Sequence, residues 1–440
     1  MSKKSISGFP ELLPAGRAVE SMVEDRLRHT FELHGFAGIQ TRSVEPLTAL
    51  EAKGETSKEV YVLQRLQSAR SGGPIPLRSD TLGLHFDLTV PLARYVLANS
   101  NDLTFPFKRY QIQKVWRGER PQEGRFREFT QADIDIVGSG DLGLHHEVEA
   151  GEVMLDAFAG LDIGPVLMEI NNRKLLQGIA TSSGIEDFEG TLRGLDKYDK
   201  IGPQGVSKEL SALGLSDSQI AVALNAAAIS VETGRQLREA VGGLGLDPTP
   251  LAEGLDELAT VLDALQEYAP GQVRASLRIA RGLDYYTGTV YETVIPGHES
   301  FGSVCSGGRY DALVSDGRRT FPGVGLSIGV SRLVALLLST GILEPGAPSP
   351  ARVLVAVTSE ETRDQSVTVA RALRQRDIAT EVSPSARKFG QQIRFAERRG
   401  INYVWFVDED GGHSVKNIVT GDQEPADPAQ WLPADVQVVE

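Results

Sequence analysis

The sequence has few of the features that mark secreted or membrane proteins. It holds one cysteine, Cys305, in 440 residues, so an internal disulfide and a cysteine-based zinc site are both excluded. No apolar run is long enough to span a membrane, and the first residues lack the apolar core of a signal peptide. These absences predict a reduced, cytoplasmic protein with no membrane partner.

An excess of basic charge is also missing. The chain has 45 Lys and Arg against 59 Asp and Glu, a formal net charge of −14. This balance excludes a uniformly basic protein that binds nucleic acid indiscriminately. Because salt screens each charge beyond roughly 10 Å, basic patches on an acidic body are still compatible with an RNA partner. The length itself predicts two or three domains.

The spacing of apolar residues predicts two kinds of domain. We expect an amphipathic helix over residues 14–35, and an antiparallel hairpin with a charged loop within residues 108–137. A region rich in Leu, Ala and Gly, about residues 173–275, is interpreted as a helical insertion. Strand-like sequence returns at residues 289–295, and the Gly-rich residues 323–329 lead into an apolar helix.

Prolines in residues 344–351 predict a linker. Beyond it, apolar strands and helices alternate through residues 352–440, which is typical of a small α/β domain with a mainly parallel sheet. The expected fold class is therefore α/β. An α+β domain with an antiparallel sheet, residues 1–343, carries the helical insertion and precedes the smaller domain.

The densest chemistry lies in residues 115–131. Five charged groups of both signs, three of them arginines, lie between Arg117 and Arg125, and the aromatic Phe129 follows. Arginine suits planar, bidentate contact with phosphate or carboxylate, and an aromatic ring beside such a cluster could stack on a purine. From composition alone, a solvated hairpin loop is an equally good interpretation.

Two other stretches also combine polar and aromatic groups. Arg281 precedes the paired Tyr285 and Tyr286, one of which could line a pocket while the other packs, because strand neighbours point to opposite faces. Asp87 and Thr89 share one face if the chain is extended there, and a carboxylate with a hydroxyl suits a substrate ammonium group. Paired tyrosines also occur on plain sheet surfaces, and pairs like Asp87 and Thr89 also cap helices.

Together these stretches resemble the histidyl-tRNA synthetase family of the class II aminoacyl-tRNA synthetases. Residues 117–129 match its motif 2 and residues 325–332 look like its motif 3, whereas residues 281–286 are similar to a signature largely confined to the histidine enzymes. Further similar segments extend the resemblance nearly end to end, namely residues 8–14, 196–200, 306–311 and 388–393.

The resemblance implies an enzyme that activates L-histidine with ATP to histidyl-adenylate and transfers histidine to the 3′ end of tRNA(His). Mg²⁺ is expected with ATP, and residues 352–440 are expected to bind the anticodon. A homodimer is also implied, with the helix of residues 14–35 and the adjoining strand near its interface. In this domain, five basic residues would contact tRNA phosphates, or would form an exposed helix surface without an RNA-binding role. They are Arg387, Lys388, Arg394, Arg398 and Arg399.

The resemblance also implies roles at the nucleotide. Arg117 would contact the α-phosphate of ATP and the carboxylate of histidine. Glu119 and Phe129 would frame the adenine, with Phe129 stacking on it. Arg125 would hold the terminal phosphates, and Arg332 would clamp the other side of the nucleotide.

The implied histidine pocket has two ends. Arg281 and Arg117 would reach the histidine as well, and are the implied catalytic residues, because fixed cations stabilise the charge that builds up on the α-phosphate. No protein-held metal ion is expected, since Arg281 takes a role that related enzymes commonly give to one. The other histidine-binding residues are Asp87, Thr89 and Gln131 at the amino group, Asp135 and Tyr286 at the imidazole nitrogens, and Tyr285 at the pocket wall.

One position departs from the family pattern, and one motif is a decoy. Motif 3 usually carries Glu before its arginine, but Ser331 precedes Arg332 here, so the bracing of the motif is an open question. Residues 138–143 satisfy G-x-G-x-x-G. The strand before them nevertheless alternates Asp133 and Asp135 with apolar residues, which predicts a half-exposed strand, unlike the buried parallel strand of a dinucleotide fold.

A second decoy is a short run of metal-binding residue types. His145, His146, Glu147 and Glu149 lack the spacing at which two histidines share a helix face, so a solvated helix is expected. Cys305 is expected to be a small packing residue.

Two other functions compete with histidine activation. A catalytically inactive paralogue that serves as the regulatory subunit of ATP phosphoribosyltransferase shares the catalytic-type fold. It typically lacks the anticodon domain and degrades the signature of residues 281–286, and both are intact here. A stand-alone module that binds RNA or an effector, without adenylation, is the third possibility.

Overall fold

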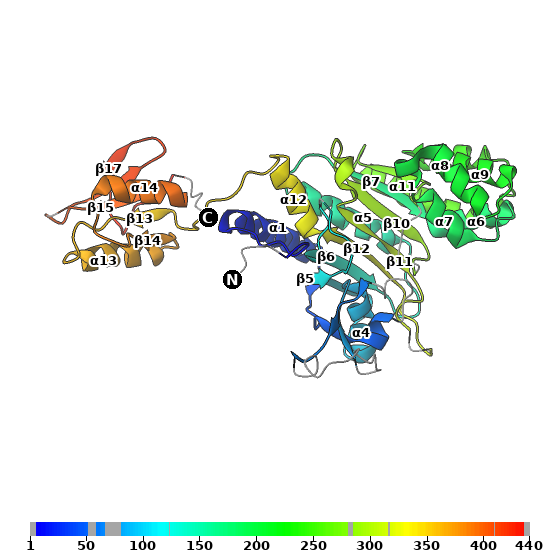
Figure 1. The fold of residues 1–440 in the computed structure, drawn as a ribbon, viewed down its shortest axis with the longest axis horizontal. Coiled ribbons are helices and arrows are strands. Elements are labelled where there is room, and N and C mark those ends of the chain that lie inside the picture. The colour runs from blue at the N-terminus through cyan, green and yellow to red at the C-terminus, as the bar shows by residue number, and fades with distance from the viewer. Residues whose placement is uncertain are drawn as a thin grey trace. The chain divides into compact units, whose positions relative to one another are not determined.

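A computed structural model describes residues 6–51, 59–66, 81–122, 124–279, 285–315, 317–408 and 410–434. The chain divides into two compact units (Figure 1). The first consists of Met1–Pro10 and Met22–Leu343, and the second of Glu11–Ser21 and Glu344–Glu440. Within the described residues, no helix is both long and apolar enough to cross a membrane.

The first unit is built on a nine-stranded sheet. Its central strands are antiparallel to their neighbours, whereas β1 pairs with β5, and β7 with β9, in parallel. The antiparallel sheet and the hairpin expected from the sequence are therefore confirmed. In spatial order the strands are β1 Ala37–Gly38, β5 Phe107–Trp116, β6 Glu128–Val137, β12 Gly323–Gly329, β11 Cys305–Tyr310, β10 Thr289–Val294, β7 Leu167–Asn172, β9 Val273–Ser276 and β8 Ser230–Val231.

Strand β6 is an interior strand of this sheet and is buried along most of its length. It pairs with β5 along ten residues, from Phe107 opposite Val137 to Trp116 opposite Glu128, and with β12 on its other edge. Every residue of β6 from Thr130 onward is buried, so the expectation of a half-exposed strand is wrong. Because both neighbours of β6 are antiparallel, residues 138–143 do not follow the parallel strand that a dinucleotide-binding loop requires.

Helices and a small sheet surround the large one. Strands β2 Val44–Pro46, β4 Leu82–Leu84 and β3 Val62–Leu63 form the small sheet, next to α2 Leu47–Glu51. Outside the insertion, the long helices of the first unit are α4 Thr89–Asn99, α5 His145–Ala159 and α12 Val330–Ser339, and α1 Pro14–Leu33 begins in the second unit and continues into the first. Helix α1 buries Val23, Leu27 and Phe31, at the helical spacing expected from the sequence.

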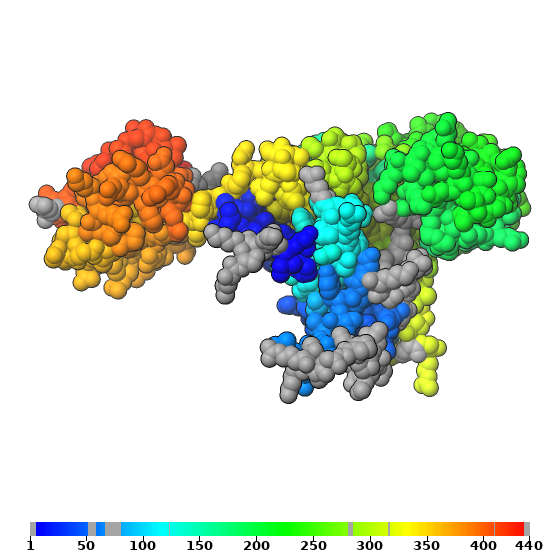
Figure 2. Space-filling model, viewed as in Figure 1, coloured from blue at the N-terminus to red at the C-terminus, as the bar shows by residue number. Residues whose placement is uncertain are grey.

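The region expected to be a helical insertion is helical along most of its length. Its helices group at one end of the first unit (Figure 1), and Figure 2 shows them as one rounded green lobe. The final residues of that region form strand β9 and join the large sheet. The helices are α6 Arg173–Ser182, α7 Phe188–Leu195, α8 Tyr198–Ala212, α9 Asp217–Ala227, α10 Gly234–Gly242 and α11 Ala252–Tyr268.

The second unit is a smaller α/β structure. Its sheet has the order β14 Thr380–Val382, β13 Val353–Val355, β15 Tyr403–Val407, β16 His413–Asn417 and β17 Gln423–Pro425. The first three strands are parallel, as expected, and β16 and β17 add an antiparallel edge. Helices α13 Arg363–Arg374 and α14 Phe389–Arg399 connect the parallel strands. Trp405 is fully buried at the centre of the core.

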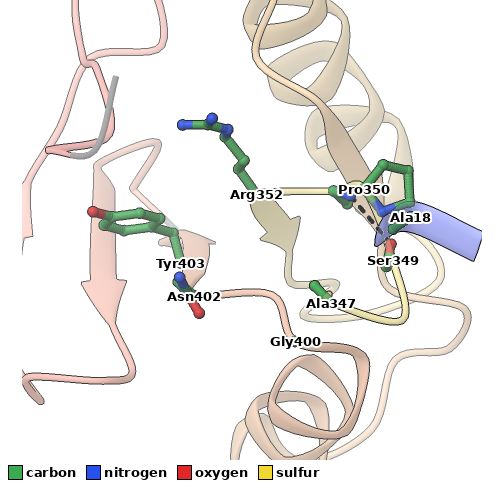
Figure 3. A pocket seen from close by; sticks show the side chains of 9 residues that line it. Ala18, Ala347, Ser349, Pro350, Arg352, Gly400, Asn402 and Tyr403 are labelled. Atoms are coloured by element: carbon green, nitrogen blue, oxygen red, sulfur yellow. Dashed lines mark hydrogen bonds between the residues drawn. The ribbon is translucent and has the colours of Figure 1, made fainter. Parts of the chain in front are cut away.

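A pocket in this second unit lies apart from every predicted site residue. Figure 3 shows Ala18 and Pro350 on one side of it and Asn402 and Tyr403 on the other. Arg352 is its one charged lining residue. The lining residues are Ala18, Ala347, Ser349, Pro350, Ala351, Arg352, Gly400, Asn402 and Tyr403.

The start of α5 differs from the expected solvated helix at one residue. Glu147 is fully buried, and its carboxylate accepts hydrogen bonds from Arg309 Nη1 at 2.9 Å and from the backbone N–H of Thr289 at 3.2 Å. His146 instead pairs with Glu149 at 2.9 Å. No group of three or more His, Cys, Asp or Glu side chains suited to a metal occurs in the part of the chain that the structure describes. Glu147 therefore ties α5 to β10 and β11.

Cys305 is buried in β11, which confirms its expected role as a packing residue. Burial raises the pKa of its thiol above the ordinary value, and the nearby charge of Asp133 adds to the rise. The thiol is therefore held in its neutral, unreactive form.

Replacing Arg309 with Ala should destabilise the first unit by about 3–5 kcal/mol, because the buried Glu147 carboxylate would lose its ion-pair partner. Denaturant unfolding of both proteins measures the difference. A matched control is Arg235→Ala, which breaks the exposed Arg235–Glu239 pair and should cost under about 0.5 kcal/mol. Equal effects of the two substitutions would show that the Glu147 pair has no special structural role.

Candidate active site

Three polar side chains follow one another along the same face of β6. Gln131, Asp133 and Asp135 alternate with Ala132 and Ile134, so the period of two in a strand places all three on one face. Each is buried, with 9%, 4% and 2% of its surface exposed. The sequence analysis assigned roles to Gln131 and Asp135 but none to Asp133, which lies between them.

Asp135 is held from both neighbouring strands. Its Oδ2 forms an ion pair with Nη2 of Arg109, its register partner on β5, at 2.5 Å. Its Oδ1 accepts a hydrogen bond from the Tyr310 hydroxyl at 2.7 Å. Its register partner on β12 is Gly325, where a Cβ would lie 2.1 Å from Oδ1. Glycine at this position thus leaves the room that the carboxylate occupies.

Burial raises the pKa of Asp135 to about 6, and the charge of Arg109 opposes the rise. Burial raises the pKa of Asp133 further, to about 7, again opposed by Arg109 and by the hydroxyl of its register partner Ser327. The charges of Asp135 and Asp87 add to the rise at Asp133. The pocket therefore holds two buried carboxyl groups whose charges one guanidinium must balance.

A short hydrogen-bond chain links the neighbours of Asp133. Gln131 Nε2 donates to Ser327 Oγ at 2.8 Å, which leaves the serine proton for Asp133. Oδ1 of Asp133 and Oε1 of Gln131 are buried and have no hydrogen-bond partner among the described residues. Two acceptors therefore face the same region without a donor.

Asp87 and Thr89 lie at the start of α4, not in an extended segment. Asp87 Oδ1 accepts from the backbone N–H of Val90 at 3.0 Å, which is the helix-capping alternative that the sequence left open. Both residues still reach the pocket, because Thr89 hydrogen-bonds Tyr285 and the charge of Asp87 acts on that tyrosine and on Asp133. The side chains are thus brought together by the helix start.

The paired tyrosines form the aromatic wall of the same region. Their rings meet edge to face at 4.9 Å, and Tyr285 meets Tyr310 edge to face at 6.3 Å. Burial raises the pKa of Tyr285 and of Tyr286 well above the ordinary value, so both hydroxyls stay protonated. Gly308 lies under Tyr286, since a Cβ there would lie 3.1 Å from the Tyr286 ring.

The arginines of the charged loop converge beside this pocket. Arg117 donates from Nε to the carbonyl oxygen of Phe86 at 2.9 Å, and its guanidinium lies 5.1 Å from the centre of the Phe129 ring. Arg125 lies 3.5 Å from a carboxylate oxygen of Glu119. The structure therefore places these four predicted residues in one cluster, on the hairpin formed by β5 and β6.

Arg332 joins the same cluster from α12. It donates to the carbonyl oxygens of Gly124 at 2.9 Å and Ser303 at 2.6 Å. Burial lowers the pKa of Arg332, and the positive charges of Arg125 and Arg117 lower it further. Three guanidinium groups repel one another at this place, so an anion bound among them would relieve the repulsion.

Ser331, the residue before Arg332, braces the start of α12. Its hydroxyl oxygen accepts a hydrogen bond from the backbone N–H of Thr130 at 2.9 Å. A glutamate carboxylate could accept from the same donor, so serine supplies the same kind of acceptor without the charge. The bond fixes the start of α12 against β6, one residue from Gln131.

Two other segments bear on the site. The carbonyl oxygen of Gly8 accepts a hydrogen bond from the N–H of Arg127 at 2.7 Å, so the opening segment supports the far arm of the charged loop. Arg281, predicted to be catalytic, lies outside the described residues, and its role stays a prediction.

Sequence reasoning missed three residues of this site. Asp133 carried a signal, because the alternation of β6 places it on the face of Gln131 and Asp135. Tyr310 was part of a quoted segment but had no expected role. Arg109 gave no signal, since a single arginine in a strand is ordinary, and only the pairing of β5 with β6 brings it to Asp135.

Comparison with known proteins gives a consistent result. A family model described as "Histidyl-tRNA synthetase" matches residues 8–333, and one described as "Anticodon binding domain" matches residues 352–430. "Histidine--tRNA ligase" of Bifidobacterium animalis subsp. lactis is 52% identical, covering 98% of this chain and 96% of that one. The protein of the same name from Cutibacterium acnes is 53% identical, covering 98% and 96%.

Solved structures agree. The crystal structure of histidyl-tRNA synthetase from Nostoc sp. PCC 7120 has a TM-score of 0.86 and 33% identity, covering 97% of each chain. A structure from Bacillus halodurans C, titled ATP phosphoribosyltransferase regulatory subunit/histidyl-tRNA synthetase, has a TM-score of 0.71 at 21% identity, covering 87% of this chain and 93% of that one. At that identity it supports the fold alone.

Replacing Asp133 with Asn should stabilise the ligand-free protein in a pH-dependent way. Burial raises the pKa of Asp133 in the folded protein to about 7, above the ordinary value of 3.8. The folded state therefore binds more protons between these two values, and the stability falls as pH rises through that window. The increase in the free energy of unfolding caused by Asp133→Asn should therefore grow from about pH 4 to pH 7 and then level off, at roughly 1–3 kcal/mol. Thermal unfolding at pH 4.5 and 7.5 measures it.

The exposed Asp141 provides the control, since Asp141→Asn should change the unfolding midpoint equally little at both pH values. A stabilisation by Asp133→Asn that is the same at pH 4.5 and 7.5 would contradict the raised pKa.

Proposed function

Because the chain belongs to the histidyl-tRNA synthetase family, we propose that it activates L-histidine with ATP, releases pyrophosphate, and transfers histidine to the 3′ end of tRNA(His). The observation that carries this function is the arginine cluster beside a buried acidic and aromatic pocket on one face of the sheet. Near-full-length identity of about half to proteins named histidine–tRNA ligase supports it.

The two units divide this task. The catalytic domain comprises residues 1–343, and its helical insertion begins near residue 173. The linker is residues 344–351. The anticodon-binding domain comprises residues 352–440. The match of residues 352–430 to an anticodon-binding family supports the last assignment. On the surface of this domain, Arg387, Lys388, Arg394 and Arg398 are exposed and available to tRNA phosphates, whereas Arg399 pairs with Glu381 at 2.5 Å.

ATP binds among the arginines. Arg117 contacts the α-phosphate, Arg125 the terminal phosphates, and Arg332 clamps the nucleotide, while Glu119 and Phe129 frame the adenine. The mutual repulsion that lowers the pKa of Arg332 supports this use, because bound phosphates neutralise all three charges. Mg²⁺ enters bound to the phosphates of ATP, as part of the substrate.

Histidine binds against β6. Its amino group meets Asp87, Thr89 and Gln131, and its imidazole nitrogens meet Asp135 and Tyr286, with Tyr285 shaping the wall. Such recognition is strict, because an analogue that lacks a partner leaves buried polar groups unpaired. The carboxylate of histidine then attacks the α-phosphorus, and Arg117 and Arg281 stabilise the charge that develops on the phosphate oxygens.

The proposed function also implies a cellular location and an oligomeric state. The protein works in the cytoplasm, where histidine, ATP and tRNA meet, and as a homodimer with α1 near the interface. The regulatory-subunit alternative is not favoured, because the relatives at about 50% identity carry the ligase name over nearly their whole length.

Pyrophosphate exchange into ATP tests the function directly. The purified protein with ATP and Mg²⁺ should catalyse exchange with histidine and with none of the other nineteen standard amino acids. Arg117→Gln should slow the exchange by about 100- to 1000-fold, since it removes a fixed cation from the developing charge. Arg281→Ala should slow it to a similar extent in a protein that unfolds as the wild type does.

The control is Arg235→Gln, a change on the exposed face of the insertion, which should leave the exchange rate unchanged. Absence of histidine-dependent exchange in the wild-type protein would refute the function. An unchanged rate in a folded Arg117 or Arg281 variant would refute the role of that residue.

Gly325→Ala tests the histidine pocket without removing a polar group. The added Cβ would overlap the Asp135 carboxylate at 2.1 Å, so Asp135 must move away from its position. The KM for histidine should rise by about 10- to 100-fold, as for the loss of a charged hydrogen bond, while the KM for ATP changes little. Gly242→Ala, at the end of α10 with nothing within 4 Å of the added atom, should change neither value.

A further inference from the structure

We infer that Asp133 is a further substrate-binding residue, whose carboxylate pairs with the α-ammonium group of the bound amino acid. The inference rests on the proposed function and adds a contact to it. Asp133 lies on the face of β6 that Gln131 and Asp135 share, between the residue assigned to the amino group and the residue assigned to the imidazole.

The first argument is the pattern of unmet hydrogen bonds. Asp133 Oδ1 and Gln131 Oε1 are buried acceptors, and neither has a donor within the described ranges. Leaving buried polar atoms unpaired costs free energy, so such atoms in a pocket indicate where a ligand binds. Both atoms are acceptors when Asp133 is ionised, and a single ammonium group has enough N–H bonds to donate to both.

The second argument is spacing. Residues two apart on a strand are separated by roughly 6.8 Å along the backbone, but Gln131 and Asp133 both bond the Ser327 hydroxyl, so their side chains converge. An ammonium nitrogen that bonds two acceptors at about 2.9 Å each holds them roughly 4.7 Å apart, which suits two converging side chains. A single ammonium group between the two side chains satisfies both. Asp87, also assigned to the amino group, lies near enough for its charge to raise the pKa of Asp133.

The third argument is charge. Asp133 and Asp135 are both buried, and among the described residues Arg109 is the cation whose charge lowers the pKa of both. Arg109 makes its ion pair with Asp135, whose two oxygens are both engaged. Asp133 has Ser327 on one side and an open oxygen on the other. When both carboxyl groups are ionised, Asp133, Asp135 and Arg109 together carry a net charge of −1. A bound cation neutralises this charge.

Ser327 gives this carboxylate a fixed direction. Its hydroxyl accepts from Gln131 Nε2 and donates to Asp133, so the two substrate-facing acceptors are held by one intervening group. A pair of acceptors that is positioned before the ligand arrives loses little entropy on binding. Ser327 is therefore a positioning residue for the amino-group site.

Two ligands that differ only in the amine test the inference: L-histidinol, and 4-(3-hydroxypropyl)imidazole, which lacks the amine. Binding of each to the full-length protein is measured by calorimetry at pH 8. In Asp133→Asn, the preference for histidinol over the amine-free ligand should fall by about 10-fold or more, as for loss of a hydrogen bond to a charged group. The affinity for the amine-free ligand should stay within about twofold.

Ser327→Ala keeps the carboxylate and loses only its orientation, so its preference should fall less, by about threefold. This second variant keeps the test valid if Asp133→Asn does not fold. Asp141→Asn, on the exposed turn after β6, is the matched control and should keep the full preference.

The results separate the possible roles of Asp133. If Asp133→Asn weakened the binding of both ligands equally, Asp133 would act on the imidazole or on the shape of the site, and the inference would be overturned. An unchanged preference in both Asp133→Asn and Ser327→Ala would overturn it as well. A wild-type protein that binds neither ligand and shows no histidine-dependent exchange would instead refute the proposed function.

Discussion

The site depends on one buried guanidinium that serves two carboxyl groups. Arg109 on β5 lies directly across from Asp135 on β6, and Asp135 lies directly across from Gly325 on β12. A slip of either strand by one residue would send these side chains to the opposite face of the sheet. The register of three antiparallel strands thus sets the charge balance of the pocket.

The same interaction links binding to stability. If both buried carboxylates had their own cationic partner, the protein would be more stable, but the site would have no net charge with which to bind a cationic ligand. Burial raises the pKa of Asp133 and of Asp135, and the charge of Arg109 opposes the rise at both carboxyl groups. This protein therefore keeps two costly buried carboxyl groups in an interior strand of its large sheet, in line with the general conflict between stability and activity at functional sites.

Much of the fold was readable from local patterns. The hairpin around the charged loop, the step from β12 into α12 and the alternating elements after residue 352 all follow from the spacing of apolar residues and from glycine and proline. Most site residues were identified by motif spacing in the resemblance to a family, since Arg117 and Phe129 lie on one continuous stretch. Their convergence with Arg332 needed the structure, because α12 is some two hundred residues away in sequence.

What escaped prediction depends on contacts between distant segments. Glu147 was expected to be solvated, since helix spacing does not reveal that Arg309 and β10 cover it. Strand β6 was expected to be half-exposed, because alternating aspartates usually face water. Asp87 and Thr89 reach the pocket from a helix start. For Glu147 and β6 a long-range partner overrides the local signal, whereas Asp87 follows the local capping pattern.

The buried thiol of Cys305 has a practical consequence for spectroscopy. Since it is the only cysteine in the chain and its raised pKa keeps it protonated, a maleimide dye will react first with any cysteine introduced at an exposed position. Site-specific fluorescent labelling thus requires no prior removal of the native cysteine. The native side chain of Cys305 and its packing within β11 then need no change.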